Sequence, residues 1–432
     1  MDRRTFISRL LLLGMSFMLV LGCAKQSDST GGTGIPVIPK KKWAGWKAGQ
    51  FQVHFIYTGV GESLFFIFPD GTTMLLDCGD HNVAGKSTSV PLLPNTSRHS
   101  GEWIARYVQR VNPNKDVVDY MMLTHYHCDH AGSEVFYADK LVQGTEEYAL
   151  SGFSQVAGYL NFSKAIDRCY PTYDDPLPLV DDSNRVFSHM KKFYSYMSEN
   201  KGLEIEKFRL GATDQIVPLR GQIEGFEVRN ICGNGRIVLP DGTIKDLYEK
   251  FKSDPPESFN ENGMSLGLEF NYGPFRFFTA GDFTADLKYP DGSRCNIEEE
   301  LAKSVRPSDV SKINHHGHNS MPAKLVSALR SKVWVSCVWS QEHDMSEVMS
   351  RLADRTAYPG DRLICPGIFP AGRQVADEGK SWVRDLAPAS FEGGHVVLNV
   401  EEGGSEYSIT YLDANSESMY IRNVSEFKTF DK

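Results

Sequence analysis

The most informative stretch of the sequence is VVDYMMLTHYHCDH at residues 117–130. Its apolar first half predicts a buried strand. Four side chains of the kinds that bind zinc follow this strand: His125, His127, Asp129 and His130. His125 and His127 lie two residues apart on extended chain, so their side chains point the same way and can share one metal ion. Asp129 and His130 lie around the following turn and can reach a second ion. The stretch therefore predicts a metal site at the end of a strand.

The segments around this stretch predict an α/β fold with a weak internal repeat. Each half of the chain has the pattern hairpin, acidic residue, helix, strand and histidine loop. In chain order these are residues 51–76, Asp77, 100–111, 117–123 and 125–130 in the first half, and residues 265–279, Asp282, 296–305, 310–313 and 314–318 in the second. Because functional sites in α/β folds form at one edge of the sheet, we expect both acidic residues and both histidine loops to meet there.

The first 22 residues predict a signal peptide. A basic start with three arginines precedes an apolar run at residues 10–21, which is shorter than the roughly 20 apolar residues of a membrane span. Residues 20–23, VLGC, resemble a bacterial lipobox, in which Cys23 becomes the lipidated N-terminus; an ordinary signal peptide with a chance cysteine is the alternative. The Arg3-Arg4 pair is similar to a twin-arginine signal. We expect a lipoprotein of the cell envelope, exported by the Sec or twin-arginine route and held at the membrane by its lipid alone.

Two further segments differ from the α/β pattern. Residues 23–42 are polar and contain a run of glycine, serine and threonine, which predicts a flexible tether before a folded body at residues 43–432. At residues 139–211 the sequence becomes partly helical, rich in tyrosine and phenylalanine, and interrupted by prolines. This stretch predicts an insertion packed near the site.

The composition excludes several classes of protein. With 41% hydrophobic and 23% charged residues, the chain of 432 residues is neither disordered nor collagen-like. Its 46 lysines and arginines against 55 acidic residues give a net charge of −9, and removal of residues 1–22, which hold three arginines and one aspartate, leaves −11. This balance argues against a stable nucleic-acid complex. Seven cysteines follow Cys23 without a tight pair, which argues against a disulfide framework.

The H-x-H-x-D-H segment resembles the signature of the metallo-β-lactamase fold superfamily, and the resemblance extends over about residues 50–415. It implies a four-layer αββα sandwich that carries the partly helical insertion and forms one hydrolase domain. It also implies that Asp77 orients a ligand histidine from behind and that Asp282 bridges two metal ions. One of the neighbouring histidines His315 and His316 would complete the site.

The choice between these two histidines depends on the backbone. Neighbouring side chains on extended chain point to opposite sides, so only one of the pair can be the ligand. We expect this to be His315, because it directly follows the predicted strand as His125 does. His316 would then contact the substrate or fix the loop.

Within the superfamily, the residues N-x-x-S, G-D and H-H-G from Asn262 onward are most similar to the hydrolase domain of the competence protein ComEC and to phosphorylcholine esterases. Many superfamily members carry another ligand histidine before the bridging aspartate. Here His189 is the only histidine in that interval, and its helical context favours a packing or surface role. Asn262 is the expected polar substitute. The residues expected to contact the substrate are Asn262, His318, Tyr126 and His395.

The resemblance implies a metal-dependent hydrolase with two zinc ions, or with manganese or iron in their place. The expected ligands are His125, His127, Asp129, His130, Asp282 and His315. A water held between two cations loses a proton near neutral pH and can attack a phosphorus or carbonyl centre. The expected catalytic residues are Asp129, Asp282 and His316, with a proton passing from Asp282 or His316 to the leaving group.

A small or envelope-derived phosphodiester is the favoured substrate. One alternative is a β-lactam, lactone or amide hydrolase with the same metal site. Another, from a different class, is a non-catalytic lipoprotein with a degenerate site that binds a glycan or another envelope component. The sequence does not indicate the oligomeric state.

Overall fold

The computed structural model describes residues 41–81, 88–133, 148–179 and 185–429. The expected signal peptide, Cys23 and the tether up to residue 40 lie outside the described residues. Among the described residues, no helix is both long enough and apolar enough to cross a membrane.

Two large mixed β-sheets form the centre of the fold. The first has the strand order β19-β18-β17-β1-β2-β3-β4-β5-β6, and the second has the order β16-β15-β14-β11-β10-β7-β8-β9. The strands of the first sheet are β1 (Phe51–Phe55), β2 (Leu64–Ile67), β3 (Thr73–Leu76), β4 (Val117–Met122), β5 (Asn161–Asp167), β6 (Glu204–Lys207), β17 (His395–Val400), β18 (Glu406–Leu412) and β19 (Ile421–Lys428). Those of the second are β7 (Phe226–Gly233), β8 (Arg236–Val238), β9 (Ile244–Asp246), β10 (Gly267–Tyr272), β11 (Phe275–Thr279), β14 (Val310–Lys312), β15 (Val333–Ser336) and β16 (Leu363–Pro366). The protein is therefore of the α/β class, as the sequence predicts.

The remaining described elements are helices and one small ribbon. The α-helices are α2 (Ser100–Val111), α3 (Cys128–Ala131), α4 (Phe153–Val156), α5 (Val186–Lys201), α6 (Ile297–Leu301), α7 (Ala323–Leu329), α8 (Ser346–Leu352) and α9 (Ala371–Ala376). The 3-10 helices are η2 (Glu249–Phe251), η3 (Glu261–Met264), η4 (Asn314–Gly317), η5 (Ser381–Asp385) and η6 (Pro388–Phe391). The ribbon pairs β12 (Asp286–Lys288) with β13 (Arg294–Asn296).

The two large sheets share an apolar core between their facing surfaces. Alternate residues of β1 and β2 pack against alternate residues of β10 and β11, as period-2 strands with one face on a core do. Phe66 stacks on Phe270 with ring centroids 4.9 Å apart, and Phe55 meets Phe277 edge-on at 6.0 Å. Offset and edge-on aromatic pairs of this kind stabilise the contact beyond the burial of area alone.

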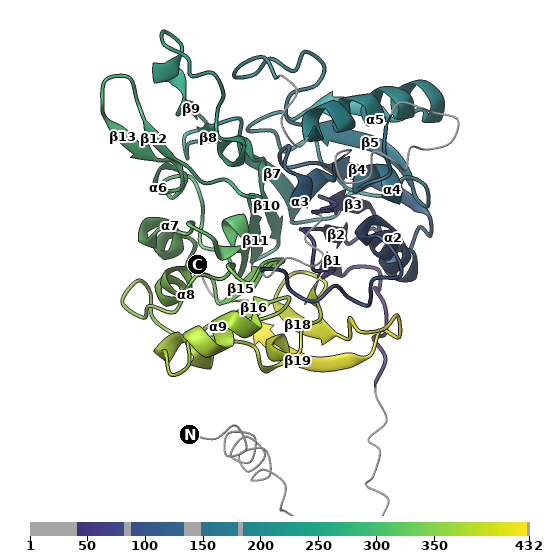
Figure 1. The fold of residues 1–432 in the computed structure, drawn as a ribbon. Coiled ribbons are helices and arrows are strands. Elements are labelled where there is room, and N and C mark those ends of the chain that lie inside the picture. Colours follow the sequence, from purple (N-terminus) through teal and green to yellow (C-terminus); the bar gives the residue numbers. More distant parts are fainter. Residues whose placement is uncertain (1–40, 82–87, 134–147, 180–184, 430–432) are drawn as a thin grey trace, which may run out of the picture. The chain divides into compact units, whose positions relative to one another are not determined.

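The helices bury the opposite surface of each sheet. On the first sheet, α2 and α5 contribute to an apolar cluster with β2, β3 and β4. On the second sheet, α6, α7 and α8 contribute to another cluster with β15 and β16. Figure 1 shows α2, α4 and α5 beside the first sheet and α6, α7 and α8 on the other side of the molecule.

The parallel parts of the two sheets bring the chemical residues to one edge. β3 and β4 are parallel in the first sheet, as are β11 and β14 in the second. The acidic and histidine loops follow the carboxyl ends of these four strands. The Leu266 N–H donates to the Thr124 carbonyl at 3.0 Å, which joins the sheets at this edge. The positions of the loops agree with the sequence prediction.

The expected insertion at residues 139–211 is partly helical in its described part, as predicted. Its described part contains the predicted helical structure in α4 and α5, but it also contains β5 and β6. These strands pair in parallel with β4 and with each other, so they extend the first sheet. The sequence pattern did not reveal them because polar residues occupy their exposed or partly exposed positions, among them Ser163 and Lys164 in β5 and Glu204 and Lys207 in β6.

Candidate metal centre

The histidine loop begins where β4 ends. His127 is the N-cap residue of the single-turn helix α3, and this turn places Asp129 and His130 on the same side as His125. Gly79 allows the loop to pack closely, because a Cβ at this position would lie 1.9 Å from the carbonyl oxygen of Asp129. The same carbonyl accepts a hydrogen bond of 2.8 Å from the N–H of Glu62, which fixes Glu62 beside the loop.

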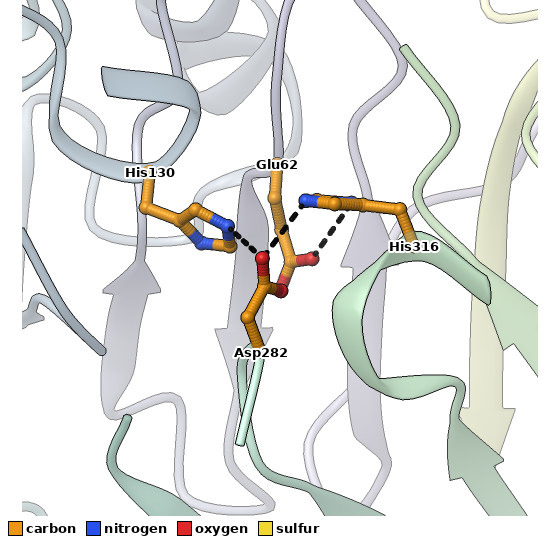
Figure 2. A group of neighbouring side chains, drawn as sticks. All are labelled: Glu62, His130, Asp282 and His316. Carbon is orange, nitrogen blue, oxygen red and sulfur yellow. Dashed lines mark ion pairs between the residues drawn. The ribbon is translucent and has the colours of Figure 1, made fainter. Parts of the chain in front are cut away.

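Four buried side chains from different segments converge at this edge. Glu62, His130, Asp282 and His316 each offer a ligand atom, and these atoms lie within 4.8 Å of one another. Figure 2 shows the four side chains pointing toward one another from separate parts of the chain. All four are at most 1% exposed to solvent. This group, called the metal-centre cluster below, could hold a metal ion.

The spacing within the cluster fits ligands of a common ion. Two ligands at about 2.0–2.1 Å from a tetrahedral zinc lie roughly 3.3 Å apart. Asp282 Oδ2 lies 3.2 Å from His130 Nε2 and 3.4 Å from His316 Nε2. His130 Nε2 makes no hydrogen bond despite the short distance, so the two groups are close without being aligned as donor and acceptor.

The other three predicted ligands of the H-x-H-x-D-H segment adjoin the cluster. His125 Nε2 lies 3.1 Å from His127 Nδ1 and 4.0 Å from Asp282 Oδ2. Asp129 Oδ2 lies 3.1 Å from His316 Nε2. Asp282 therefore lies near His125 as well as near His130 and His316, which is the position expected of a bridging carboxylate.

Hydrogen-bond acceptors that contact Nδ1 of three histidines direct the Nε2 atoms of these histidines toward the cluster. His130 Nδ1 lies 2.7 Å from Asp77 Oδ2, and His316 Nδ1 lies 2.7 Å from the Cys337 carbonyl. His125 Nδ1 lies 3.1 Å from the Thr124 hydroxyl, which itself donates to Asp77. Since carboxylates and carbonyls accept hydrogen bonds, these Nδ1 atoms carry a proton, and Nε2 is the atom that could bind a metal after releasing its own proton. Asp77 thus lies where the resemblance places an orienting residue.

The histidine pair after β14 is arranged differently from the prediction. His316, not His315, enters the cluster, whereas His315 Nε2 lies 3.1 Å from Asn262 Nδ2. The reason is the backbone. Both residues have left-handed conformations, with φ of 48° at His315 and 51° at His316. The chain turns here instead of continuing the strand, so the argument from alternating side chains does not apply.

Buried polar atoms without partners support a metal at this position. Among the described residues, His130 Nε2, Asp282 Oδ1 and Glu62 Oε1 are buried and make no hydrogen bond. Such atoms normally carry a partner, because an unsatisfied buried polar group is costly. The donor set of imidazole nitrogens and carboxylate oxygens is the set that zinc prefers. The residues therefore fit the metal that the resemblance implies.

The protonation of the cluster also favours a cation. Burial by itself would lower the pKa of His130, but Asp282, Asp129 and Asp77 hold that pKa well above its usual range. In the same way, the carboxylates of Asp282 and Asp129 outweigh burial and raise the pKa of His316 to about 9. Burial would raise the pKa of Asp282, but His316 and His130 keep it well below its usual range. Without a metal, protons compensate the carboxylates, and a divalent cation would displace them.

Two functional candidates, Glu62 and Lys312, are absent from the sequence prediction. Lys312 Nζ forms an ion pair with Glu62 Oε2 at 2.8 Å and donates to the Gly281 carbonyl at 2.8 Å, and both side chains are completely buried. Lys312 is also 4.0 Å from Asp282 Oδ1. A lysine inside an apolar strand, V-S-K-I, is the one signal in the sequence that could have pointed to this pair.

The predicted substrate-contacting residues separate into two groups. Asn262, His315 and His318 line a cavity of about 650 Å³, and Tyr126 lines one of about 500 Å³ together with His127. His395 does not reach the cluster, because its Nδ1 accepts a hydrogen bond from the Tyr57 N–H and its ring packs on Tyr107.

His189 also lies away from the cluster. It is fully buried on α5, with Nε2 3.3 Å from the Ser154 hydroxyl and 3.4 Å from the Ser151 carbonyl. These contacts agree with the packing role that the sequence favours.

No protein-family profile matches the chain, and no curated protein matches its sequence at a significant level.

Proposed function

We propose that the protein is a metal-dependent hydrolase with a four-layer αββα fold of the metallo-β-lactamase type, acting on a phosphodiester. The observation that carries this proposal is the convergence of imidazole and carboxylate groups from the β1–β2 loop and from the ends of β4, β11 and β14, with buried atoms that lack hydrogen-bond partners. The resemblance of the H-x-H-x-D-H segment supports the fold type and the reaction.

We propose two metal ions, and the test described below counts how many the protein binds. The first would be held by His125, His127 and Asp282, and the second by Asp129, His130, Asp282 and His316. Glu62 is within reach of the second group, although its ion pair with Lys312 engages one of its oxygens. Cations held here would polarise the scissile bond of the substrate and lower the pKa of a bound water.

Other residues of the site orient the proposed ligands or can contact the substrate. Asp77 and the Cys337 carbonyl hold His130 and His316 in the orientation that presents Nε2. Because His316 is directed at the centre, His315 becomes the histidine that can contact substrate, and Asn262 fixes its ring. Burial lowers the pKa of His315 to about 4, so its ring is neutral near pH 7.

The test combines metal content with turnover. Purified protein is reconstituted with zinc, its metal is counted by mass spectrometry, and hydrolysis of bis-p-nitrophenyl phosphate, a chromogenic lactam and single-stranded DNA is measured. We expect bound zinc and cleavage of the diester. Asp282→Ala should lose both the second equivalent of metal and turnover, while Asp361→Ala, at an exposed aspartate that lines neither cavity, serves as control.

Three results would contradict the proposal. Unchanged metal content and rate in Asp282→Ala would remove the proposed centre. Cleavage of the lactam alone would assign the same site to amide-type hydrolysis. No retained metal after reconstitution would favour a binding protein with a degenerate site.

We also propose that the enzyme is anchored in the cell envelope through Cys23. The VLGC sequence at residues 20–23 supports this. Expression of the full chain and of Cys23→Ser in a bacterial host tests it. The parent protein should fractionate with membranes and carry lipid by mass spectrometry, and the variant should not; equal fractionation without lipid would contradict the anchor.

A further inference from the structure

Two cavities of different chemistry lie next to neighbours of the metal-centre cluster, although none of the four cluster residues lines either cavity. The cavity of about 650 Å³, called the polar cavity, is lined by Asn262 and His315. The cavity of about 500 Å³, called the apolar cavity, is lined by His127 and Tyr126. Asn260 lines both, so the two cavities meet at this residue beside the proposed ligands.

The polar cavity offers hydrogen-bonding groups and negative charge. Its lining includes exposed carboxylates at Asp286 and Glu347. Among its described lining residues, the one lysine or arginine is Arg351, whose guanidinium donates to the carbonyls of Ser320 and Met321 at 2.7 and 2.8 Å. Because these carbonyls are neutral, Arg351 keeps its positive charge, but the two exposed carboxylates outnumber it, so an anionic group would meet a lining of net negative charge.

Amide side chains indicate what the polar cavity binds, because Asn260, Asn262, Asn296 and Asn319 line it. Asn262 is 8% exposed, and its Oδ1 has no hydrogen-bond partner among the described residues. A buried amide oxygen gains most from a neutral O–H or N–H donor. The cavity therefore suits a group that carries hydroxyls or amides.

The apolar cavity has aliphatic and aromatic walls formed by Leu177, Phe187 and Phe259. Its one arginine or lysine among the described lining residues, Arg168, is 2% exposed. The guanidinium is already used, because it donates two hydrogen bonds of 2.8 Å to the carboxylate of Glu261. This cavity therefore suits an alkyl or aryl group, and it offers an anion the exposed carboxylate of Glu257 but no unpaired cation.

We propose that the substrate carries two uncharged arms on either side of the scissile bond, an alkyl or aryl arm in the apolar cavity and a hydroxyl-bearing arm in the polar cavity. This inference rests on the proposed function, which places the scissile bond at the metal-centre cluster between the cavities. A polyanion such as a nucleic acid is disfavoured, because its flanking phosphates would be desolvated beside more carboxylates than cations.

Matched p-nitrophenyl phosphodiesters test the charge of the polar arm. The second ester group is 2,3-dihydroxypropyl, 2-carboxyethyl or methyl, so that hydroxyls, an anion and a small reference group are compared. We expect kcat/KM of the dihydroxypropyl ester to exceed that of the carboxyethyl ester by about tenfold, chiefly through KM. Equal or better turnover of the carboxyethyl ester would overturn the inference.

Two surface variants connect this preference with the cavities. Glu347→Lys should lower KM for the anionic ester and so reduce the difference in kcat/KM between the two esters. Glu378→Lys, at an exposed glutamate outside both cavities, should leave this difference unchanged. Leu177→Asn should raise KM for the aryl esters several-fold, whereas Leu219→Asn, at a 52% exposed leucine outside both cavities, should not. Variants indistinguishable from their controls would contradict the assignment of the cavities.

A binding measurement separates this inference from the proposed function. Octyl glucoside has an apolar tail and a hydroxyl-rich head but no phosphate, and its binding is followed by calorimetry below the micelle concentration. Saturable binding weakened by Leu177→Asn, together with no diester cleavage, would support the cavities and reject the hydrolase. Cleavage of all the diesters at equal kcat/KM, together with no binding of octyl glucoside, would support the hydrolase and contradict the proposal of two uncharged arms.

Discussion

Asp77 illustrates how one residue behind the cluster sets its geometry. Its carboxylate accepts hydrogen bonds from the Thr124 N–H and hydroxyl, both at 2.8 Å, and contacts His130 Nδ1. It therefore fixes the start of the histidine loop and the orientation of one proposed ligand. Such supporting groups change metal affinity without touching the metal.

We predict that Asp77→Asn weakens metal binding by about 10- to 100-fold while the protein remains folded. The amide can no longer accept from every donor that surrounds the carboxylate, so His130 is held less firmly. Zinc affinity is measured by competition with a chromogenic chelator. Asp70→Asn, which alters a turn remote from the cluster, is the matched control, and an unchanged affinity in Asp77→Asn would contradict the orienting role.

Lys312 is a second residue that supports the metal-centre cluster, and it does so through its positive charge. Burial alone would lower the pKa of Lys312, but Glu62 and Asp282 outweigh it and raise the pKa to about 12. Lys312 is therefore a cation near pH 7 and balances the carboxylates of the cluster. Removing one partner of a buried ion pair leaves the other charge uncompensated.

We predict that Lys312→Met lowers the free energy of unfolding by about 3–5 kcal/mol. Urea unfolding monitored by fluorescence measures the change. The double variant Glu62→Gln, Lys312→Met should recover much of the loss, because it leaves no unpaired charge. Lys303→Met removes an exposed pair with Glu300 and should change stability by at most about 1 kcal/mol. A Lys312→Met protein as stable as the parent would contradict the role of this pair.

At the scale of elements, a buried glutamate ties the turn η4 to its neighbours. Glu298 of α6 accepts hydrogen bonds from the Asn314 amide at 3.0 Å and from the Met321 N–H at 3.1 Å. It also accepts from the Thr284 hydroxyl at 3.0 Å. These contacts hold both the loop after Asp282 and the left-handed turn that presents His316.

The ionisation of Glu298 should make this region sensitive to pH. Burial raises the pKa of Glu298 to about 7, above the value of about 4.3 in an unfolded chain. The folded state therefore holds this proton more tightly. Its contribution to stability is complete below about pH 4.3 and is lost as the pH rises through 7, by roughly 3 kcal/mol.

We predict that Glu298→Gln loses less unfolding free energy than the parent protein between pH 4.5 and 7.5, by up to about 3 kcal/mol, because glutamine has no proton to release. Chemical unfolding at a series of pH values measures the difference. Glu299→Gln, one residue away at a site where the carboxylate pairs with Lys324, should follow the parent profile. Parallel profiles for Glu298→Gln and the parent would contradict the buried acid.

At the scale of the whole molecule, the proposed metal would connect the two sheets. His125 and His130 belong to the loop after β4, whereas Asp282 and His316 follow β11 and β14. A ligand that binds only the folded state stabilises it in proportion to the logarithm of its concentration, by roughly 4 kcal/mol at a thousand times Kd.

We predict that removal of metal by a chelator lowers the thermal unfolding midpoint by several degrees and that zinc restores it. Differential scanning calorimetry of the full chain measures both steps, and magnesium, which prefers oxygen ligands, is the control ion. An unchanged midpoint after verified removal of the metal would show that the two sheet edges do not depend on it.

Most of the edge that carries the site could be predicted from the sequence. The strand before His125, the acidic loops at Asp77 and Asp282 and the α/β class follow from periodicity and local motifs, because hydrophobic alternation and ligand spacing are properties of neighbouring residues. The strands β5 and β6 could not be recognised this way, because their polar edge positions weaken the same pattern.

The sequence by itself determined which chemical groups are available and that two histidine loops follow two buried strands. Only the tertiary structure decided that His316 faces the cluster and His315 faces a cavity, because that depends on left-handed backbone at both residues. It also brought Glu62 and Lys312 together from positions 250 residues apart in the chain. Such a buried pair forms only when packing excludes water from both groups, a condition that no local pattern of residues specifies.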